Sequence, residues 1–172
     1  MHSKILIFDF GSQYTQLIAR RIRELNVYCE IHPYNHLDVL DKQDFNGIIL
    51  SGSPFSVLQE DALQFPVREV LERFRLPMLG VCYGAQYIAH IFDGKVERSS
   101  KREYGRAHLD YIEPTNKLFK DIPAKSQVWM SHGDSVLELP AGFDLLATTD
   151  SIPVAAFKHT ETELYSIQSL CV

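Results

Sequence analysis

Blocks of apolar and polar positions predict that strands and helices alternate over the first half of the chain. Four short segments are typical of buried strands: Lys4–Asp9, residues 27–31, Gly47–Leu50 and Met78–Val81. Apolar residues recur at helical spacing in three segments, which are residues 14–25, 62–74 and 85–92. Ser12 is the expected N-cap of the first helix, and Asn26 its end. This order implies right-handed crossovers and a largely parallel sheet.

Past Gly94 the pattern changes to short strand-like runs separated by turn residues. These runs are residues 106–112, 127–130, 145–148, 154–157 and 164–168. The sequence shows no internal repeat, low-complexity stretch or linker. We therefore predict one α/β domain over residues 1–172. Its expected architecture is an open, mostly parallel flavodoxin-like sheet with helices on both faces and a small antiparallel extension.

Composition and charge narrow the class of protein. Lysine and arginine total 17 against 22 aspartate and glutamate residues, so the net charge is −5, and no basic stripe offers a site to nucleic acid. The apolar run before Asp9 is too short for a signal peptide or a membrane span. The three cysteines, at 29, 82 and 171, have neither disulfide-type nor zinc-type spacing. We expect a cytoplasmic protein with reduced thiols, no metal site, and neither a membrane nor a nucleic-acid partner.

One cysteine stands in a motif that carries chemistry. Cys82 is flanked by Gly80 and Gly84, after a predicted strand and before a predicted helix, which is the G-x-S-x-G elbow with a thiol in place of the hydroxyl. The helix N-terminus is expected to lower the thiol pKa. The Tyr83 backbone N–H is placed to stabilise an oxyanion. The alternative, a small buried hydrophobe, suits Cys29 better than Cys82.

A second oxyanion donor is expected from a neighbouring loop. Residues 51–54 (Ser-Gly-Ser-Pro) follow an adjacent predicted strand and could supply a backbone N–H, although a plain strand-ending turn is the alternative. A phosphate-binding loop is excluded here, because Phe55 stands where a pyrophosphatase-type loop needs an acid and no lysine follows.

Five segments together carry a resemblance to a known family. They read IFDFGSQYTQ from Ile7, ILSGSP from Ile49, GVCYGAQ from Gly80, REYG from Arg102 and VWMSHGD from Val128. From about Lys4 to Gln168 the chain resembles the class I glutamine amidotransferases, and among them the glutaminase domains of GMP synthetases.

The resemblance implies a reaction and a partner. A cysteine thiolate attacks the side-chain amide of glutamine, ammonia leaves, and water releases glutamate from the thioester. No cofactor is implied for this domain. The implied partner is a synthetase (ATP pyrophosphatase) domain or subunit, which holds ATP and Mg and uses the ammonia to aminate XMP to GMP.

The resemblance also assigns roles to individual residues. Cys82 is the implied nucleophile, and the backbone N–H groups of Ser53 and Tyr83 form the implied oxyanion hole. The implied substrate-binding residues are Gln86, Ser131, His132, Gly133 and Asp134, the last four in one loop. Without the resemblance, each of these five would be an ordinary polar or glycine residue of a helix start or a turn.

The sequence departs from the family pattern at two places. Ser53 stands where the family usually has glycine, which costs energy if the turn needs a positive φ. After residues 165–168 the family continues with Phe-His-Pro-Glu, whose His and Glu complete the triad, whereas this chain reads Ser-Leu-Cys-Val to Val172. We therefore expect a truncated or frameshifted domain that lacks its closing helix and a synthetase domain. Alone it should be a poor or inactive glutaminase, with uncovered apolar surface that favours instability or self-association.

Three other functions stay open from the sequence. The first is a non-catalytic domain that binds glutamine or docks on a synthetase. The second is a cysteine-based redox sensor on a similar sheet, against which the WMSHGD and SGSP segments argue. The third is an amidotransferase that serves anthranilate or carbamoyl phosphate synthesis, which would not be expected to carry FDFGSQYTQ.

Overall fold

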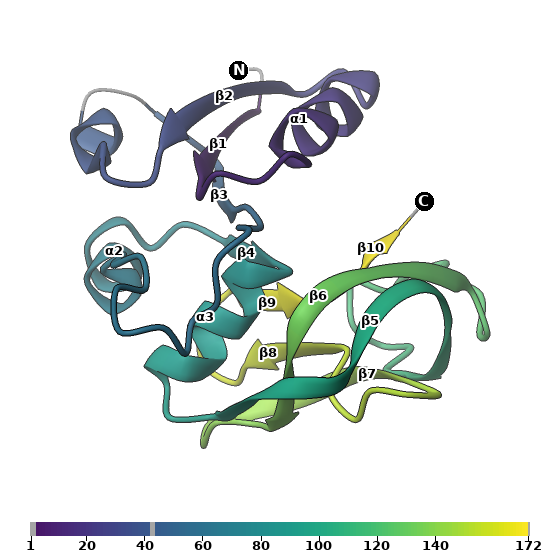
Figure 1. Ribbon diagram of the computed structural model, residues 1–172. Helices are drawn as coiled ribbons and strands as arrows, with labels where there is room; N and C mark the ends of the chain where they lie inside the picture. The colour runs from purple at the N-terminus through teal and green to yellow at the C-terminus, as the bar shows by residue number, and fades with distance from the viewer. Residues whose placement is uncertain (1–2, 42–43, 172) are drawn as a thin grey trace.

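The chain folds around one long sheet. A computed structural model describes residues 3–41 and 44–171, and it describes side chains outside residues 100–104 and 170–171. Within these ranges ten strands form a sheet in the order β10-β6-β5-β7-β8-β9-β4-β3-β1-β2 (Figure 1). Val172, the last residue of the departing C-terminal segment, lies outside the described residues.

The parallel half of the sheet consists of the four buried strands that the apolar pattern predicts and of β9, which comes from the runs past Gly94 that we assigned to the antiparallel extension. In spatial order its strands are β2 (Tyr28–Pro33), β1 (Lys4–Asp9), β3 (Gly47–Leu50), β4 (Met78–Val81) and β9 (Leu164–Ile167), and all neighbours pair in parallel. The order 2-1-3-4 followed by one more strand is that of flavodoxin-like sheets. The predicted α/β class and flavodoxin-like order are therefore confirmed.

The antiparallel part is larger than the small extension we expected. Its strands are β5 (Lys95–Ile112), β6 (Gln127–Glu138), β7 (Phe143–Thr149), β8 (Ala156–His159) and β10 (Leu170–Cys171). In Figure 1 the β5–β6 hairpin curves away from the parallel strands. Only one face of β6 is consistently buried, so polar residues can occupy its other face. The strand therefore extends well beyond residues 127–130, the short run that predicted it.

Three α-helices and one 3₁₀ helix pack against the sheet. They are α1 (Thr15–Glu24), η1 (Leu37–Asp41), α2 (Val67–Phe74) and α3 (Tyr83–Ile91) in the described ranges. None of the helices in that part of the chain is long and apolar enough to cross a membrane.

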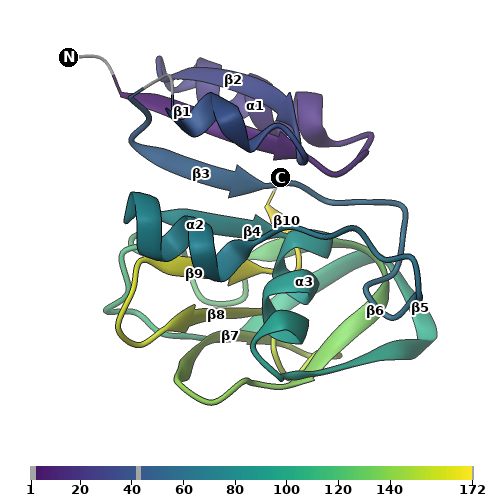
Figure 2. The same cartoon turned by 90° about the vertical axis from the view of Figure 1, so that its left-hand side faces the viewer.

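Alternate side chains of β1 enter different cores on the two faces of the sheet. Ile7 packs with Ala19 and Cys29 beneath α1, whereas Leu6 and Phe8 belong to the larger core beneath α2 and α3. Figure 2 shows α2 and α3 in front of the sheet and α1 behind it. The expected placement of helices on both faces is confirmed, as is the expectation that Cys29 is a core residue.

The starts of the first two helices differ from the prediction. Ser12 is not the N-cap of α1: its hydroxyl accepts the Tyr14 N–H at 3.0 Å in a turn that precedes the helix. The second helix begins only after Pro66, because the residue before a proline is kept out of the helical conformation. Asn26 adopts a φ of 58° just beyond α1, which ends that helix as expected.

Candidate active site

The turn from β4 into α3 holds Cys82 in a strained backbone conformation. Its φ of 51° and ψ of −107° are rarely adopted by residues that carry a side chain. The flanking glycines allow close packing there. A Cβ at Gly80 would lie 2.6 Å from Ile88 Cδ1, and a Cβ at Gly84 would lie 2.6 Å from the Leu50 carbonyl oxygen. The local structure is therefore that of a nucleophile elbow.

Cys82 lies at the carboxyl edge of the parallel strands. β4 pairs with β3 on one side and with β9 on the other, and the Cys82 N–H donates to the Ile167 carbonyl oxygen at the end of β9, at 2.9 Å. α3 begins at Tyr83, two residues before the predicted start, and a first helical residue has no intrahelical acceptor for its N–H. This edge is where open α/β sheets bind their ligands.

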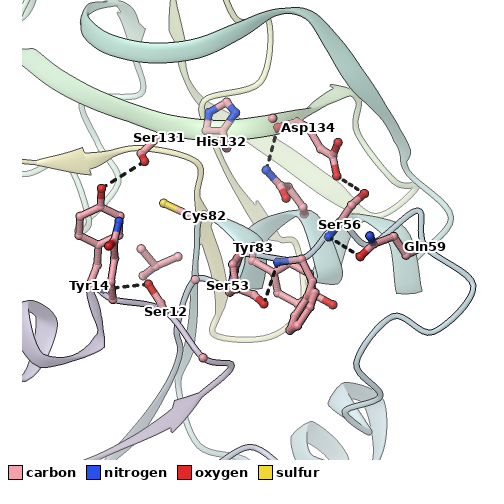
Figure 3. Close-up of a pocket in the computed structure, with 18 of the residues that line it drawn as sticks. Ser12, Tyr14, Ser53, Ser56, Gln59, Cys82, Tyr83, Ser131, His132 and Asp134 are labelled. Atoms are coloured by element: carbon pink, nitrogen blue, oxygen red, sulfur yellow. Dashed lines mark hydrogen bonds between the residues drawn. The ribbon is translucent and has the colours of Figure 1, made fainter.

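A pocket of about 650 Å³ opens at this edge and contains the cysteine (Figure 3). All eight residues that the sequence singles out line it: Ser53, Cys82, Tyr83, Gln86, Ser131, His132, Gly133 and Asp134. They come from the turn after β3, from the elbow, from α3 and from β6. The structure brings them together, while the role of each one stays a prediction.

The Cys82 thiol is buried, with 8% of the residue exposed. Burial raises its pKa to about 12, because a thiolate in these surroundings loses its hydration. We expected the N-terminus of α3 to lower this pKa, whereas the shift is upward and burial is its cause. The thiol is therefore neutral at pH 7.

The turn after β3 packs closely against the elbow. A Cβ at Gly52 would lie 3.2 Å from Ser12 Oγ and 3.7 Å from Cys82 Cβ, so the backbone of this turn runs next to the nucleophile. Ser53 is not among the described residues that adopt a positive φ. Its side chain therefore costs no left-handed strain, and the turn does not require the glycine that the family usually has there.

Residues 131–134 lie within strand β6 and not in the loop that we expected. His132 and Asp134 are buried, whereas Gly133 between them is exposed. The Gln86 side-chain amide donates to the Asp134 carbonyl oxygen at 2.8 Å and so ties α3 to this strand. The loop prediction was wrong because a short polar segment with a glycine looks like a turn, while the hairpin partner β5 extends past it.

Several lining residues were missed by sequence reasoning. They belong to the segment after β1 and to the segment after β3: Gly11, Ser12, Gln13, Tyr14, Pro54, Phe55, Ser56 and Gln59. The Tyr14 hydroxyl lies 3.3 Å from Ser131 Oγ, and the Ser56 hydroxyl donates to the Asp134 carboxylate (Figure 3). Their position after strands that end at the same sheet edge is the signal that could have found them.

The chain leaves β9 beside the elbow. Gln168 is fully buried; its Oε1 accepts the Val136 N–H at 3.1 Å and its Nε2 donates to the Val154 carbonyl oxygen. β10 then pairs with β6, with Leu170 opposite Trp129. The positions at which the family carries Phe-His-Pro-Glu therefore follow directly on the strand that neighbours Cys82.

Comparisons with known proteins define the class. The model of the family "Glutamine amidotransferase class-I" matches residues 6–169, and the chain belongs to this family. Its relatives include enzymes named GMP synthase (glutamine-hydrolysing): the protein of Cytophaga hutchinsonii is 55% identical and that of Phocaeicola vulgatus 49% identical, each over 168 residues. These matches cover 98% of this chain but only 32% of either relative. The chain thus spans about a third of the length of the curated relatives it matches.

Solved structures agree with this assignment. A candidate GMP synthase subunit from Thermoplasma acidophilum is 27% identical, with a TM-score of 0.82, over 98% of this chain and 84% of that one. A glutamine amidotransferase from Thermotoga maritima has a TM-score of 0.74 over 98% of this chain and 76% of that one. Its identity is 19%, so that second likeness concerns the fold alone.

Proposed function

We propose that this chain is the glutamine-binding and glutamine-hydrolysing part of a GMP-forming enzyme. The observation that carries the proposal is the elbow cysteine, which lies in the same pocket as the backbone and side-chain groups of β6 and α3. Cys82 Sγ bonds to the side-chain amide carbon of glutamine, and the amide nitrogen leaves as ammonia with the thiol proton. Water then cleaves the thioester, which releases glutamate and restores the thiol.

The negative charge that develops on the amide oxygen requires hydrogen-bond donors nearby. We assign the backbone N–H groups of Ser53 and Tyr83 to this role. Tyr83 is the first residue of α3, and Ser53 belongs to the turn whose backbone runs next to Cys82. Such prearranged donors are commonly worth about 3–4 kcal/mol to an acyl-transfer step.

The other end of glutamine carries an ammonium and a carboxylate. Asp134 contributes a buried carboxylate to the pocket, so we assign it to the α-ammonium group. The backbone of Ser131, His132 and Gly133, together with Gln86, surrounds the remainder of the ligand. Replacing Asp134 with Asn should therefore weaken glutamine binding more than it changes any step at the thiol.

The whole reaction needs a partner for the released ammonia. We propose that a synthetase (ATP pyrophosphatase) domain or subunit, working with ATP and Mg in the cytoplasm, uses the ammonia to aminate XMP. The names of the relatives support this proposal, and so does the third of their length that the chain covers. We propose no cofactor for the glutaminase part itself.

We further propose that the 172-residue chain alone turns glutamine over slowly. Burial keeps the Cys82 thiol neutral, and a neutral thiol is a weaker nucleophile than a thiolate. A domain that binds glutamine without hydrolysing it is therefore the second candidate, and the raised thiol pKa is the observation that favours it.

The decisive experiment combines ammonia release with calorimetric glutamine binding, for the parent chain and for Cys82→Ala. We expect binding by both proteins and ammonia release that barely exceeds the Cys82→Ala background. Rapid, cysteine-dependent release would contradict the slow turnover and exclude the second candidate. Absence of glutamine binding would overturn the proposed function.

A further inference from the structure

The part of β6 that lines the pocket pairs irregularly with β5, its partner in the hairpin. Asp134 pairs with Arg98 and His132 pairs with Glu103, so two steps along β6 correspond to five steps along β5. The regular ladder is thus interrupted opposite Gly133. Bulges of this kind occur next to active sites, where they redirect a strand or end its pairing. Ser131, His132 and Asp134 are paired with β5, but the register skips Gly133, so contacts from other segments add to the support of residues 131–134.

Three hydrogen bonds from three separate elements reach this segment across the pocket. The Tyr14 hydroxyl, just before α1, lies 3.3 Å from Ser131 Oγ. The Ser56 hydroxyl, in the segment after β3, donates to the Asp134 carboxylate. Gln86 in α3 donates to the Asp134 carbonyl oxygen. Figure 3 shows these bonds around the pocket that contains Cys82.

Ser56 is itself held in place. Its hydroxyl accepts the Leu58 N–H at 3.1 Å, and its own N–H donates to Gln59 Oε1 at 3.1 Å. The hydroxyl hydrogen is therefore available to the carboxylate of Asp134, a residue that is only 6% exposed. A buried carboxylate requires such a donor, so the bond fixes both the orientation of Asp134 and the distance between the two segments.

We propose that Tyr14 and Ser56 are positioning residues that fix residues 131–134 of β6 at the pocket, so that the strand is ready to receive the amino-acid end of glutamine. The inference rests on the proposed function, because it names glutamine as the ligand. Neither residue needs to touch the reacting atoms. Both act through β6, and this gives a structural reason for the Tyr14 hydroxyl within the segment IFDFGSQYTQ and for the serine that follows ILSGSP.

The test compares Tyr14→Phe and Ser56→Ala with the parent chain. Each substitution removes one hydroxyl and little volume. Amide hydrogen exchange of residues 131–135 should accelerate by about fivefold to tenfold in each variant, and glutamine should bind about fivefold to tenfold more weakly by calorimetry. Ser56→Thr keeps a hydroxyl and should restore both values.

Matched controls separate positioning from a general loss of structure. Tyr28→Phe removes an exposed hydroxyl that donates to Glu30 at 3.2 Å, and Ser126→Ala removes one that donates to the Pro123 carbonyl oxygen at 2.7 Å. Both lie away from the pocket and should change neither the exchange at residues 131–135 nor glutamine affinity.

The outcomes distinguish this inference from the proposed function. A parent chain that binds glutamine, with variants that match it in exchange and affinity, would overturn the positioning roles and leave the function standing. Faster exchange across the whole sheet in the variants would also overturn them, since it indicates global destabilisation. A parent chain that does not bind glutamine would overturn the proposed function and the ligand named here. Exchange at residues 131–135 would still decide whether the two hydroxyls hold β6.

Discussion

Cys82 combines a strained backbone with a neutral thiol. A conformation such as its φ of 51° and ψ of −107° costs about 1–3 kcal/mol and persists only where the surroundings enforce it. Here the enforcement comes from α3, which packs so closely that Gly80 and Gly84 have no room for a side chain. Burial then raises the thiol pKa. The residue is thus well placed for attack but is not ionised on its own.

The pH dependence of alkylation tests this state of the thiol. With a pKa raised from 9.0 to about 12, the thiolate fraction at pH 8 is roughly a thousandfold below that of an unburied cysteine. Modification of Cys82 by iodoacetamide, followed by mass spectrometry, should therefore be slow and should keep rising with pH up to 10. A plateau below pH 8 would show that the thiol is activated.

The same shift affects stability. The folded protein holds the thiol proton more tightly than the unfolded chain, so this contribution to stability is complete below pH 9 and is lost as the pH rises toward about 12. We expect the free energy of unfolding to fall over this window, and to fall less in Cys82→Ala. Urea titrations at pH 8 and pH 10 measure the difference, and equal losses in the two proteins would contradict it.

The elbow glycines provide a third test at the scale of single residues. Gly84→Ala places a methyl group 2.6 Å from the Leu50 carbonyl oxygen, so we expect a loss of about 1–3 kcal/mol in unfolding free energy. Gly133→Ala is the matched control, because a Cβ there meets nothing within 4 Å. Urea denaturation of both variants checks this, and equal stabilities would contradict the packing argument.

At the scale of elements, strands buried on both faces could be predicted from the sequence and the hairpin could not. β1, β3 and β4 have the predicted boundaries, because continuous apolar runs require burial on both sides. β5 and β6 carry polar residues on one face and a bulge, so their length is set by pairing and not by local pattern.

In the candidate site, too, some features could be predicted from the sequence and others could not. The cysteine motif could be predicted because the glycines and the nucleophile are adjacent in sequence. Tyr14 and Ser56 could not, because their partners lie on a strand far along the chain. The raised thiol pKa could not either, since it depends on how deeply the folded chain buries the sulfur.

Gln168, which follows β9, connects this strand to β6 and to the segment before β8. It offers a test at the scale of elements. Its side chain bonds the backbone of β6 at Val136 and the segment before β8 at Val154. Gln168→Ala would leave two buried backbone groups without partners, so we expect a loss of about 2–4 kcal/mol in unfolding free energy. Gln64→Ala, which removes an exposed side chain bonded to the Ala62 carbonyl oxygen, should change stability little. Chemical denaturation of both variants provides the comparison.

At the scale of the whole molecule, an apolar groove runs between α1 and the sheet. Its volume is about 720 Å³. The lining is mostly apolar and includes Leu17, Leu25, Leu79, Trp129 and Ile167. Leu25 is 76% exposed and Leu17 is 43% exposed. Exposed apolar surface of this kind favours association.

We therefore expect the 172-residue chain to self-associate as its concentration rises. Leu17→Glu with Leu25→Glu should shift the sedimentation pattern toward monomer, because two carboxylates in the groove oppose burial. Ile122→Glu is the control, since Ile122 is also exposed, at 39%, but does not line the groove. A parent chain that sediments as monomer at every concentration would contradict the prediction.

The pairing of β4 with β9 has a consequence for how the protein is made. Cys82 emerges from the ribosome well before the strand whose Ile167 carbonyl oxygen accepts its N–H. This hydrogen bond therefore forms only after the whole β5–β8 region has been translated, and contacts between such distant segments form slowly. Because residues 131–134 and β9, which lie around the thiol in the folded chain, are made later, we expect nascent chains to be more vulnerable to oxidation at Cys82 than the finished fold.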